Sequence, residues 1–159
     1  MLTFYFVRHG SKEAIPFDPP LTKVGVKQAE ITSDYLKQVF FKAIITSPKL
    51  RAKQTAEIIA RSHSIPAIVD DRLVERLEWE NKETFDEFIK EWSKSDLNRE
   101  YQPNRGDSSI NKGKIMKEAI DELSEKYNDG NILIVTHGGS IGDLLRNLFK
   151  REDMPGEID

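Results

Sequence analysis

Short runs of apolar residues alternate with amphipathic segments along most of this chain. Four runs are rich in β-branched or aromatic side chains, as buried strands are, and they lie at residues 4–7, 43–46, 67–69 and 132–136. Between and after them, apolar side chains recur at helical spacing, which predicts helices near residues 22–40, 48–62, 84–95, 116–127 and 141–148. Strands that alternate with helices favour an α/β fold, a three-layer αβα sandwich whose mostly parallel sheet carries helices on both faces.

Two residues are suited to start helices. Thr22 is a typical N-cap, although Gly25 weakens the first turn that follows it. Ser47 is also a typical N-cap, and Pro48 follows it at the first helical position, where a missing N–H group costs nothing. We therefore expect a helix to begin directly after Ser47.

Polar segments separate these elements. Residues 11–20 hold three prolines and no hydrophobic period, and residues 97–113 are rich in Asn, Gly and Arg, so both are expected to be loops. The length of 159 residues indicates one domain over residues 1–159, with a loop or lid region at about 70–113 and a loose tail at about 151–159.

Composition and charge narrow the classes of function. The formal net charge of −3 argues against a nucleic-acid or membrane-surface binder, and the absence of cysteine excludes disulfides and thiolate chemistry. No apolar run approaches the roughly 20 residues that span a bilayer, and no basic leader precedes the first strand. We therefore expect a soluble, cytoplasmic protein, and the sequence does not indicate its oligomeric state.

Two of the predicted strands end in the same way. Arg8, His9 and Gly10 follow the first strand, and His137 and Gly138 follow the last. In open α/β sheets, ligands bind beyond the carboxyl ends of the strands, where helix N-termini gather. If the two strands are parallel neighbours, the two histidines face each other across such a crevice.

The same edge of the sheet is expected to collect further polar residues. Arg51 lies one turn into the helix after the second strand, and Glu75 follows the third strand. Two guanidinium groups, together with the amides of Gly10 and Gly138, suit a multiply charged tetrahedral anion such as a phosphate ester. Two histidines without metal-site spacing favour covalent catalysis, in which a neutral imidazole attacks phosphorus. The expected site therefore needs no metal and no cofactor.

These residues fall within motifs that resemble those of the histidine phosphatase superfamily, which has the phosphoglycerate-mutase-like fold. The family's R-H-G stands at residues 8–10, its L-T-x-x-G-x-x-Q-A at 21–29, its S-P-x-x-R-A-x-Q-T-A at 47–56, its L-x-E at 73–75 and its T-H-G-G at 136–139. The matches keep the family's order from residue 4 to residue 149, so the resemblance covers nearly the whole chain.

The resemblance implies a role for each candidate residue. His9 would be the phosphorylated nucleophile, and Glu75 would be the acid that protonates the leaving alcohol. Arg8, Arg51 and His137 would form the rest of the phosphate pocket.

Two segments depart from the family pattern. Many members carry an asparagine after R-H-G that contacts phosphate, whereas residues 11–15 are SKEAI here, so the amide or hydroxyl of Ser11 is a candidate substitute. The segment after the acid, RLEWEN at residues 76–81, lacks the glycines of the usual G-x-W-E-G. Glu78, or Asp107 in a segment similar to the family's G-E-S, is therefore an alternative general acid.

The resemblance implies a metal-independent phosphatase that hydrolyses phosphate monoesters through a phosphohistidine on His9. Its substrate would be a phosphorylated small molecule or a phosphoprotein. The alternatives are a phosphotransferase of the phosphoglycerate mutase type, a protein phosphohistidine phosphatase, and a non-catalytic module that binds a phospho-ligand.

Sequence features weigh against some of these alternatives. The stretch between Glu75 and residue 116 is short, whereas the family's mutases carry longer insertions there. The intact His9 and His137 disfavour a non-catalytic module. No G-x-G-x-x-G follows the first strand, which disfavours a dinucleotide-binding domain.

Overall fold

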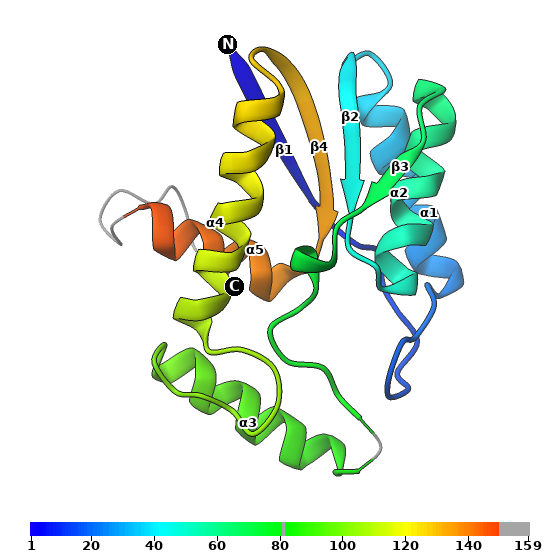
Figure 1. The fold of residues 1–159 in the computed structure, drawn as a ribbon. Coiled ribbons are helices and arrows are strands. Elements are labelled where there is room, and N and C mark those ends of the chain that lie inside the picture. Colours follow the sequence, from blue (N-terminus) through cyan, green and yellow to red (C-terminus); the bar gives the residue numbers. More distant parts are fainter. Residues whose placement is uncertain (81, 150–159) are drawn as a thin grey trace.

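The computed structural model describes residues 1–80 and 82–149, and these form a sheet of four parallel strands (Figure 1). The strands are β1 (Leu2–Arg8), β2 (Phe41–Thr46), β3 (Ala67–Val69) and β4 (Gly130–Thr136). Their order across the sheet is β1-β4-β2-β3. The first and last strands of the sequence are therefore neighbours.

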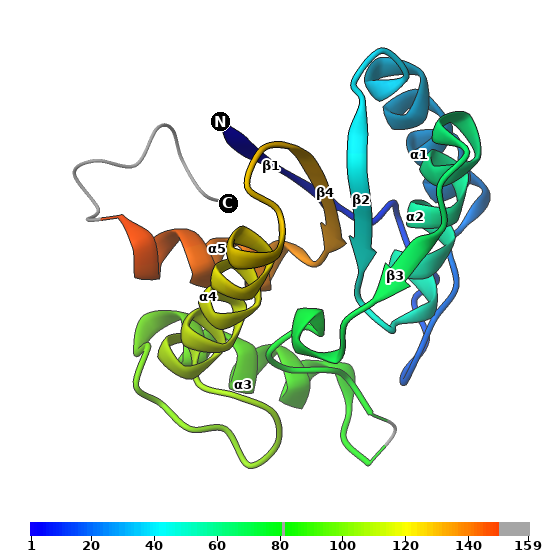
Figure 2. The ribbon, with the colours of Figure 1, turned by 45° about the horizontal axis from the view of Figure 1, so that its top comes forward.

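Helices cover both faces of this sheet. They are α1 (Lys23–Leu36), α2 (Leu50–His63), α3 (Phe85–Leu97), α4 (Ser109–Lys126) and α5 (Gly138–Leu148), with a 3₁₀ turn at Asp71–Leu73. α1 and α2 pack on one face, and α4 and α5 pack on the other (Figures 1 and 2). This arrangement confirms the expected three-layer α/β sandwich.

The central strand β4 supplies side chains to both faces. Leu133 and Val135 pack with α1 and α2, whereas Ile132 and Ile134 pack with α4 and α5. All four side chains are fully buried. A strand that is buried on both faces carries an unbroken apolar run, which is why this strand is evident in the sequence.

The helix α3 stands apart from the layers. It lies beyond the carboxyl ends of the strands (Figure 1), and Ser95 is its one buried residue. Its apolar side chains have the spacing expected from the sequence, but they belong to neither core. They face the edge of the sheet at which the two histidines lie.

The helix α2 begins later than expected. Its N-cap is Lys49 and its first residue is Leu50, so Ser47 is not the cap. The reason is that the Ser47 hydroxyl is buried and hydrogen-bonded to Nε2 of His137, 2.8 Å away. A residue with the chemistry of a cap is used here to hold a histidine.

The helix α4 begins earlier than expected, so the loop after α3 ends at residue 108. Ser108 caps α4 by accepting a hydrogen bond from the amide of Asn111. Gly113 suggested a loop, but it lies inside the helix, where a side chain would collide with the backbone of Asp143 in α5. The glycine is there because α4 and α5 pack closely. The tail at about 151–159 lies outside the described residues.

The loop after β1 passes over the first turn of α1 in very close contact. Thr22 caps α1 as expected, with its Oγ1 accepting from the amide of Gly25 at 3.0 Å. A side chain at Gly25 would collide with the backbone of Ser11, and a side chain at Gly10 would collide with the backbone of Gly25. Gly25 therefore weakens its helix in exchange for a contact that fixes the residues next to His9.

We expect Gly25→Ala to destabilise the fold by about 1–3 kcal/mol, because a methyl group overpacks this contact. Helix propensity alone would give the opposite sign, a gain of roughly 1 kcal/mol for alanine over glycine. The free energy of unfolding, measured by urea denaturation, distinguishes these two expectations. The control is Val24→Ala in the same turn, where the side chain is exposed and a change within about 0.5 kcal/mol is expected. A Gly25→Ala protein more stable than wild type would contradict the close contact.

Candidate active site

The register of β1 and β4 brings the two histidines together. Arg8 pairs with Thr136, the last residues of the two strands, so His9 and His137 both emerge at the same edge. The amide of His9 donates to the carbonyl of Thr136 at 3.0 Å, and the two imidazole ring centroids lie 5.1 Å apart. The two histidines therefore meet as expected, but their rings are in edge contact, and only His9 lines the cavity, whereas His137 is buried.

The hydrogen bonds of His9 define its tautomer. Nε of Arg51 is a donor only, and it points at Nε2 of His9 from 3.1 Å, so Nε2 carries the lone pair. Nδ1 then carries the proton, which it donates to the carbonyl of Gly10 at 2.7 Å. Burial, together with the charges of Arg51 and Arg8, lowers the pKa of His9 from 6.5 to about 4. The ring is therefore neutral at pH 7, and the lone pair on Nε2 is unprotonated and accepts from Arg51.

Arg51 lies between the two histidines and is almost completely buried, with 2% of its side chain exposed. Its Nη2 donates to Nδ1 of His137 at 3.2 Å and to Oε1 of Glu78 at 2.6 Å. Its Nη1 is buried and has no hydrogen-bond partner among residues 1–80 and 82–149. This side chain offers an unused donor to a further acceptor in the crevice.

His137 is fully buried. Because Nδ1 accepts from Arg51, its proton lies on Nε2, which donates to the hydroxyl of Ser47. Burial, reinforced by the charge of Arg51, lowers the pKa of His137 well below 6.5. Both histidines of the pair are thus neutral, and Arg51 carries the positive charge between them.

The glycine and serine amides near His9 are used within the protein. The amide of Gly10 donates to Oγ1 of Thr55 at 3.2 Å, and the amide of Ser11 donates to Oε1 of Gln28 at 2.8 Å. Neither amide is free for a phosphate oxygen, so only the Ser11 hydroxyl can replace the missing asparagine. Thr55 and Gln28 lie in two of the recognised motifs, and sequence reasoning did not assign them this positioning role.

Arg8 and Gly138 lie against each other at the mouth of the site. A side chain at Gly138 would press on the Arg8 side chain, so the glycine leaves room for the guanidinium. Both residues line the same cavity as His9, Ser11 and Arg51. This cavity has a volume of about 890 Å³.

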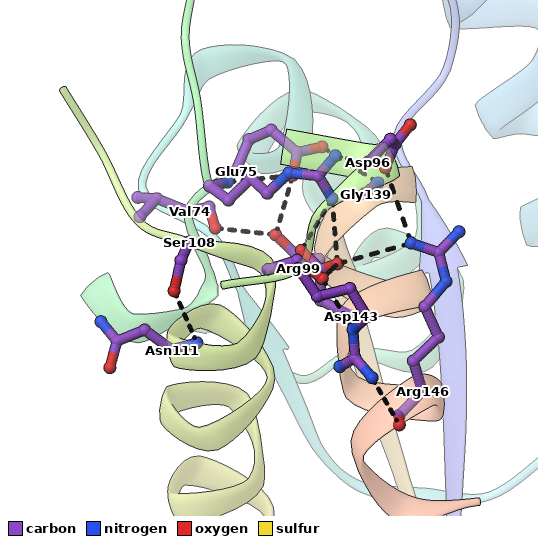
Figure 3. Close-up of polar contacts among 12 residues, drawn as sticks. Val74, Glu75, Asp96, Arg99, Ser108, Asn111, Gly139, Asp143 and Arg146 are labelled. Carbon is purple, nitrogen blue, oxygen red and sulfur yellow. Dashed lines mark hydrogen bonds and ion pairs between the residues drawn. The ribbon is translucent and has the colours of Figure 1, made fainter. Parts of the chain in front are cut away.

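Glu75 is held at the N-terminus of α5. Its Oε2 accepts from the amide of Gly139 at 3.1 Å (Figure 3). Its Oε1 accepts from the amide of Arg76 at 3.0 Å and lies 3.1 Å from the hydroxyl of Ser140, which is also 2.9 Å from the carbonyl of Val74. Burial raises the pKa of Glu75 above its usual range, against the bond from Arg76. A buried carboxyl group of this kind suits proton donation to a leaving group.

The other two acid candidates are placed differently. Glu78 lines the cavity, but its carboxylate is paired with Arg51. Asp107 is not among the cavity-lining residues, and its carboxylate accepts from the side-chain amide of Asn111 at 2.6 Å. Of the three carboxylates, Glu75 is the one in the cavity without a cationic partner within ion-pair distance among the described residues.

A buried ionic network fixes the segment after Glu75. Nη1 of Arg76 lies 2.9 Å from both carboxylate oxygens of Asp143, and Nη2 lies 2.5 Å from Asp96. Its guanidinium also stacks on the Trp92 ring at 4.2 Å. Figure 3 shows Asp96 and Asp143 gathered beside Glu75. This network connects the segment that follows Glu75, here called the acid segment, to α3 and α5. No pattern in the sequence indicated the network.

The described residues contain neither a metal-binding cluster nor a membrane-spanning helix. Among residues 1–80 and 82–149, no group of three or more His, Asp or Glu side chains is placed to hold a metal ion. In the same part of the chain, no helix combines the length and apolarity needed to cross a membrane.

Comparison with protein families gives one match over almost the full length. The model described as "Histidine phosphatase superfamily (branch 1)" matches residues 4–155. Among curated proteins, the probable phosphoglycerate mutase GpmB of Yersinia enterocolitica is 32% identical over 162 residues, covering 94% of this chain and 75% of the relative.

Solved structures share the fold. YhfR of Bacillus stearothermophilus is 28% identical with a TM-score of 0.78, over 98% of this chain and 82% of that one. A mycobacterial glucosyl-3-phosphoglycerate phosphatase is 22% identical with a TM-score of 0.77, over 94% of this chain and 79% of that one.

We expect the His9 imidazole to stay neutral as the pH falls below 6.5 and to be protonated only as the pH passes through about 4. The unfolded chain binds this proton at a higher pH than the folded chain does. The contribution of His9 to the free energy of unfolding therefore decreases as the pH drops from 6.5 to 4. The measurement is a titration of imidazole ¹⁵N shifts by NMR, with His9→Ala to assign the signal. A midpoint near 6.5 would contradict the described environment.

Proposed function

This chain belongs to the histidine phosphatase superfamily, and from that premise we propose that it is a metal-independent phosphatase that hydrolyses phosphate monoesters through a phosphohistidine on His9. The observation that carries the proposal is the lone pair of His9 Nε2, which is held unprotonated beside the buried guanidinium of Arg51. A nucleophile must be unprotonated, and a phosphate ester needs a cation next to the point of attack.

In the first step, His9 Nε2 attacks phosphorus and the bond from phosphorus to the ester oxygen breaks. The new N–P bond makes the ring a cation, and the carbonyl of Gly10 stabilises it by accepting the Nδ1 proton at 2.7 Å. Glu75 gives its proton to the departing oxygen, so the alcohol leaves neutral. Arg51 and Arg8 surround the equatorial oxygens, where charge accumulates, and His137 holds Arg51 in place by accepting from its Nη2.

In the second step, water attacks the phosphohistidine in line. The Glu75 carboxylate left by the first step takes a proton from this water, and the N–P bond breaks to return neutral His9. Inorganic phosphate then leaves the crevice. The acid and its conjugate base are one residue, so the cycle ends with Glu75 protonated again.

One donor of Arg51, Nη2, is already occupied by a carboxylate. Glu78 pairs with Arg51 at 2.6 Å, so a phosphate oxygen that takes this donor must displace Glu78 or repel it. Glu78 therefore competes with the substrate for Arg51, which makes it a poor general acid and a modulator of phosphate affinity.

A mutase is the second candidate, and the curated relative named as a probable phosphoglycerate mutase favours it. A mutase would use the same phosphohistidine but return the phosphoryl group to a second alcohol. Transfer of phosphate between the hydroxyls of added phosphoglycerate, without release of inorganic phosphate, would replace the phosphatase proposal.

We expect the wild-type protein to release phosphate from 4-nitrophenyl phosphate in the presence of EDTA, and His9→Ala to lose this activity. The nucleophile is a side chain, so a chelator has no effect. Thr3→Ala, a change in the same strand away from the strand end, serves as a control for handling. An active His9→Ala protein, or loss of wild-type activity with EDTA, would contradict the mechanism.

We expect Glu75→Gln to lower turnover of an alkyl phosphate by about 10²–10⁴-fold, because an alkoxide leaves poorly without a proton. The loss in kcat/KM, which reports the first step, is smaller for 4-nitrophenyl phosphate, whose phenolate leaves readily. Glu78→Gln instead retains turnover and tightens binding of orthovanadate or phosphate several-fold, because the competing carboxylate is gone. Steady-state kinetics with both substrates and inhibition by vanadate separate the two residues. Reversed behaviour would make Glu78 the acid.

A further inference from the structure

We propose that the cavity selects phosphate monoesters of apolar alcohols of about the size of a phenyl or larger group, with the organic group held between α3 and the loop after β1. This inference rests on the proposed function and names its substrate class. It derives from the division of one continuous cavity into a charged end and an apolar end.

The charged end holds the residues already described around His9. The apolar end of the same cavity is lined by side chains from three separate segments, namely Ile15, Phe17, Leu77, Trp79, Phe85, Phe88, Ile89 and Trp92. The volume of about 890 Å³ lies in the range of pockets that enclose ligands of drug size, and exceeds the need of a phosphate group.

One wall is the apolar face of α3. Phe85, Phe88 and Trp92 form a continuous row of rings with centroids 6.1 Å apart, and Trp79 extends it by an edge contact with Phe85 at 5.2 Å. Ile89 on this face is 41% exposed. This face packs into neither core, so its apolar surface borders the cavity.

The opposite wall is the loop of residues 11–20. Phe17 adopts a positive φ of 70°, which is strained for a bulky residue. Its amide donates to the carbonyl of Trp79 at 2.8 Å, which ties the loop to the acid segment across the cavity. The Phe17 side chain lines the cavity and remains half-exposed. Backbone strain is thus accepted at a residue whose ring faces the ligand space.

The arginines near the apolar end of the cavity are already paired with carboxylates of the protein. They are therefore not free to bind an acidic group of the substrate other than its phosphate. Arg76 is paired with Asp143 and Asp96, and Arg146 lies 3.5 Å from Asp96. Lys12 lines the same cavity, and burial, together with the charge of Arg51, lowers its pKa. A small acidic ester such as phosphoglycerate would therefore leave the aromatic wall uncovered.

The test uses binding of non-hydrolysable phosphonates. We expect 2-phenylethylphosphonate to bind about tenfold to a hundredfold more tightly than ethylphosphonate, because the ring is buried against the apolar wall. The fluorescence of tryptophan reports the binding directly, since both tryptophans of the chain line the cavity. The two ligands share the same anionic group, so they differ only in the apolar end.

Variants locate the effect. Phe88→Ala and Phe85→Ala are expected to remove most of the preference for the phenyl ligand while leaving ethylphosphonate affinity unchanged. Phe85 is 53% exposed, so its replacement cannot unfold the core even if Phe88→Ala does. Phe40→Ala is the matched control, because this ring is 90% exposed and does not line the cavity.

Each outcome decides the inference separately from the proposed function. Three results would overturn the inference. They are equal affinity for the two phosphonates, inhibition by 3-phosphoglycerate that is tighter than inhibition by 2-phenylethylphosphonate, and equal effects of Phe40→Ala and Phe85→Ala. A preference for the phenyl ligand without turnover of either 2-phenylethyl or ethyl phosphate would uphold the apolar site and refute the phosphatase. Turnover of both esters with equal kcat/KM would uphold the phosphatase and add to the case against the apolar site.

Discussion

A single buried guanidinium governs the arrangement at the carboxyl edge of the sheet. Arg51 donates to His9 and to His137, and its charge helps to keep both imidazoles neutral. A buried cation needs an anion, and neither histidine can supply one. Glu78 fills this requirement in the structure, and the phosphate of a substrate fills it in the proposed reaction. In the proposed reaction, one anion is exchanged for another around a fixed positive charge.

Backbone packing places the groups around Arg51, and several of these contacts exclude side chains. The absence of a side chain at Gly25 leaves room for the loop that carries Ser11. The absence of a side chain at Gly138 leaves room for the Arg8 side chain. At Gly139, a side chain would collide with the Glu75 carboxylate and with Trp92. The acid can therefore reach the amide at the start of α5 only because that position is a glycine. The charged side chains of Arg8 and Glu75 are therefore positioned by glycines, which leave room for them.

Much of this arrangement could be predicted from sequence, because strands and helices leave periodic patterns. The strand that ends at Thr136 and the capped start of α1 follow from local spacing. The meeting of the two histidines also requires that β1 and β4 pair in parallel, as they do here. The role of Ser47 could not be predicted, because its hydroxyl is equally suited to a helix cap and to a histidine partner. Gly113 misled for a similar reason, since its cause is a contact with another helix. The periodicity of apolar residues describes one helix or strand at a time. The roles of Ser47 and Gly113 depend instead on which elements pack against each other.

The acid segment shows how the departures from the family pattern are compensated. It lacks the usual glycines, and contacts from three directions hold it: Arg76 binds Asp143, Glu78 binds Arg51, and the Trp79 carbonyl accepts from Phe17. In the proposed reaction, a phosphate group that takes Nη2 of Arg51 displaces Glu78, and an apolar group packs against Trp79. Both ends of such a substrate contact the few residues that follow Glu75. The proposed mechanism therefore couples recognition of the leaving group to delivery of its proton through one short stretch of backbone.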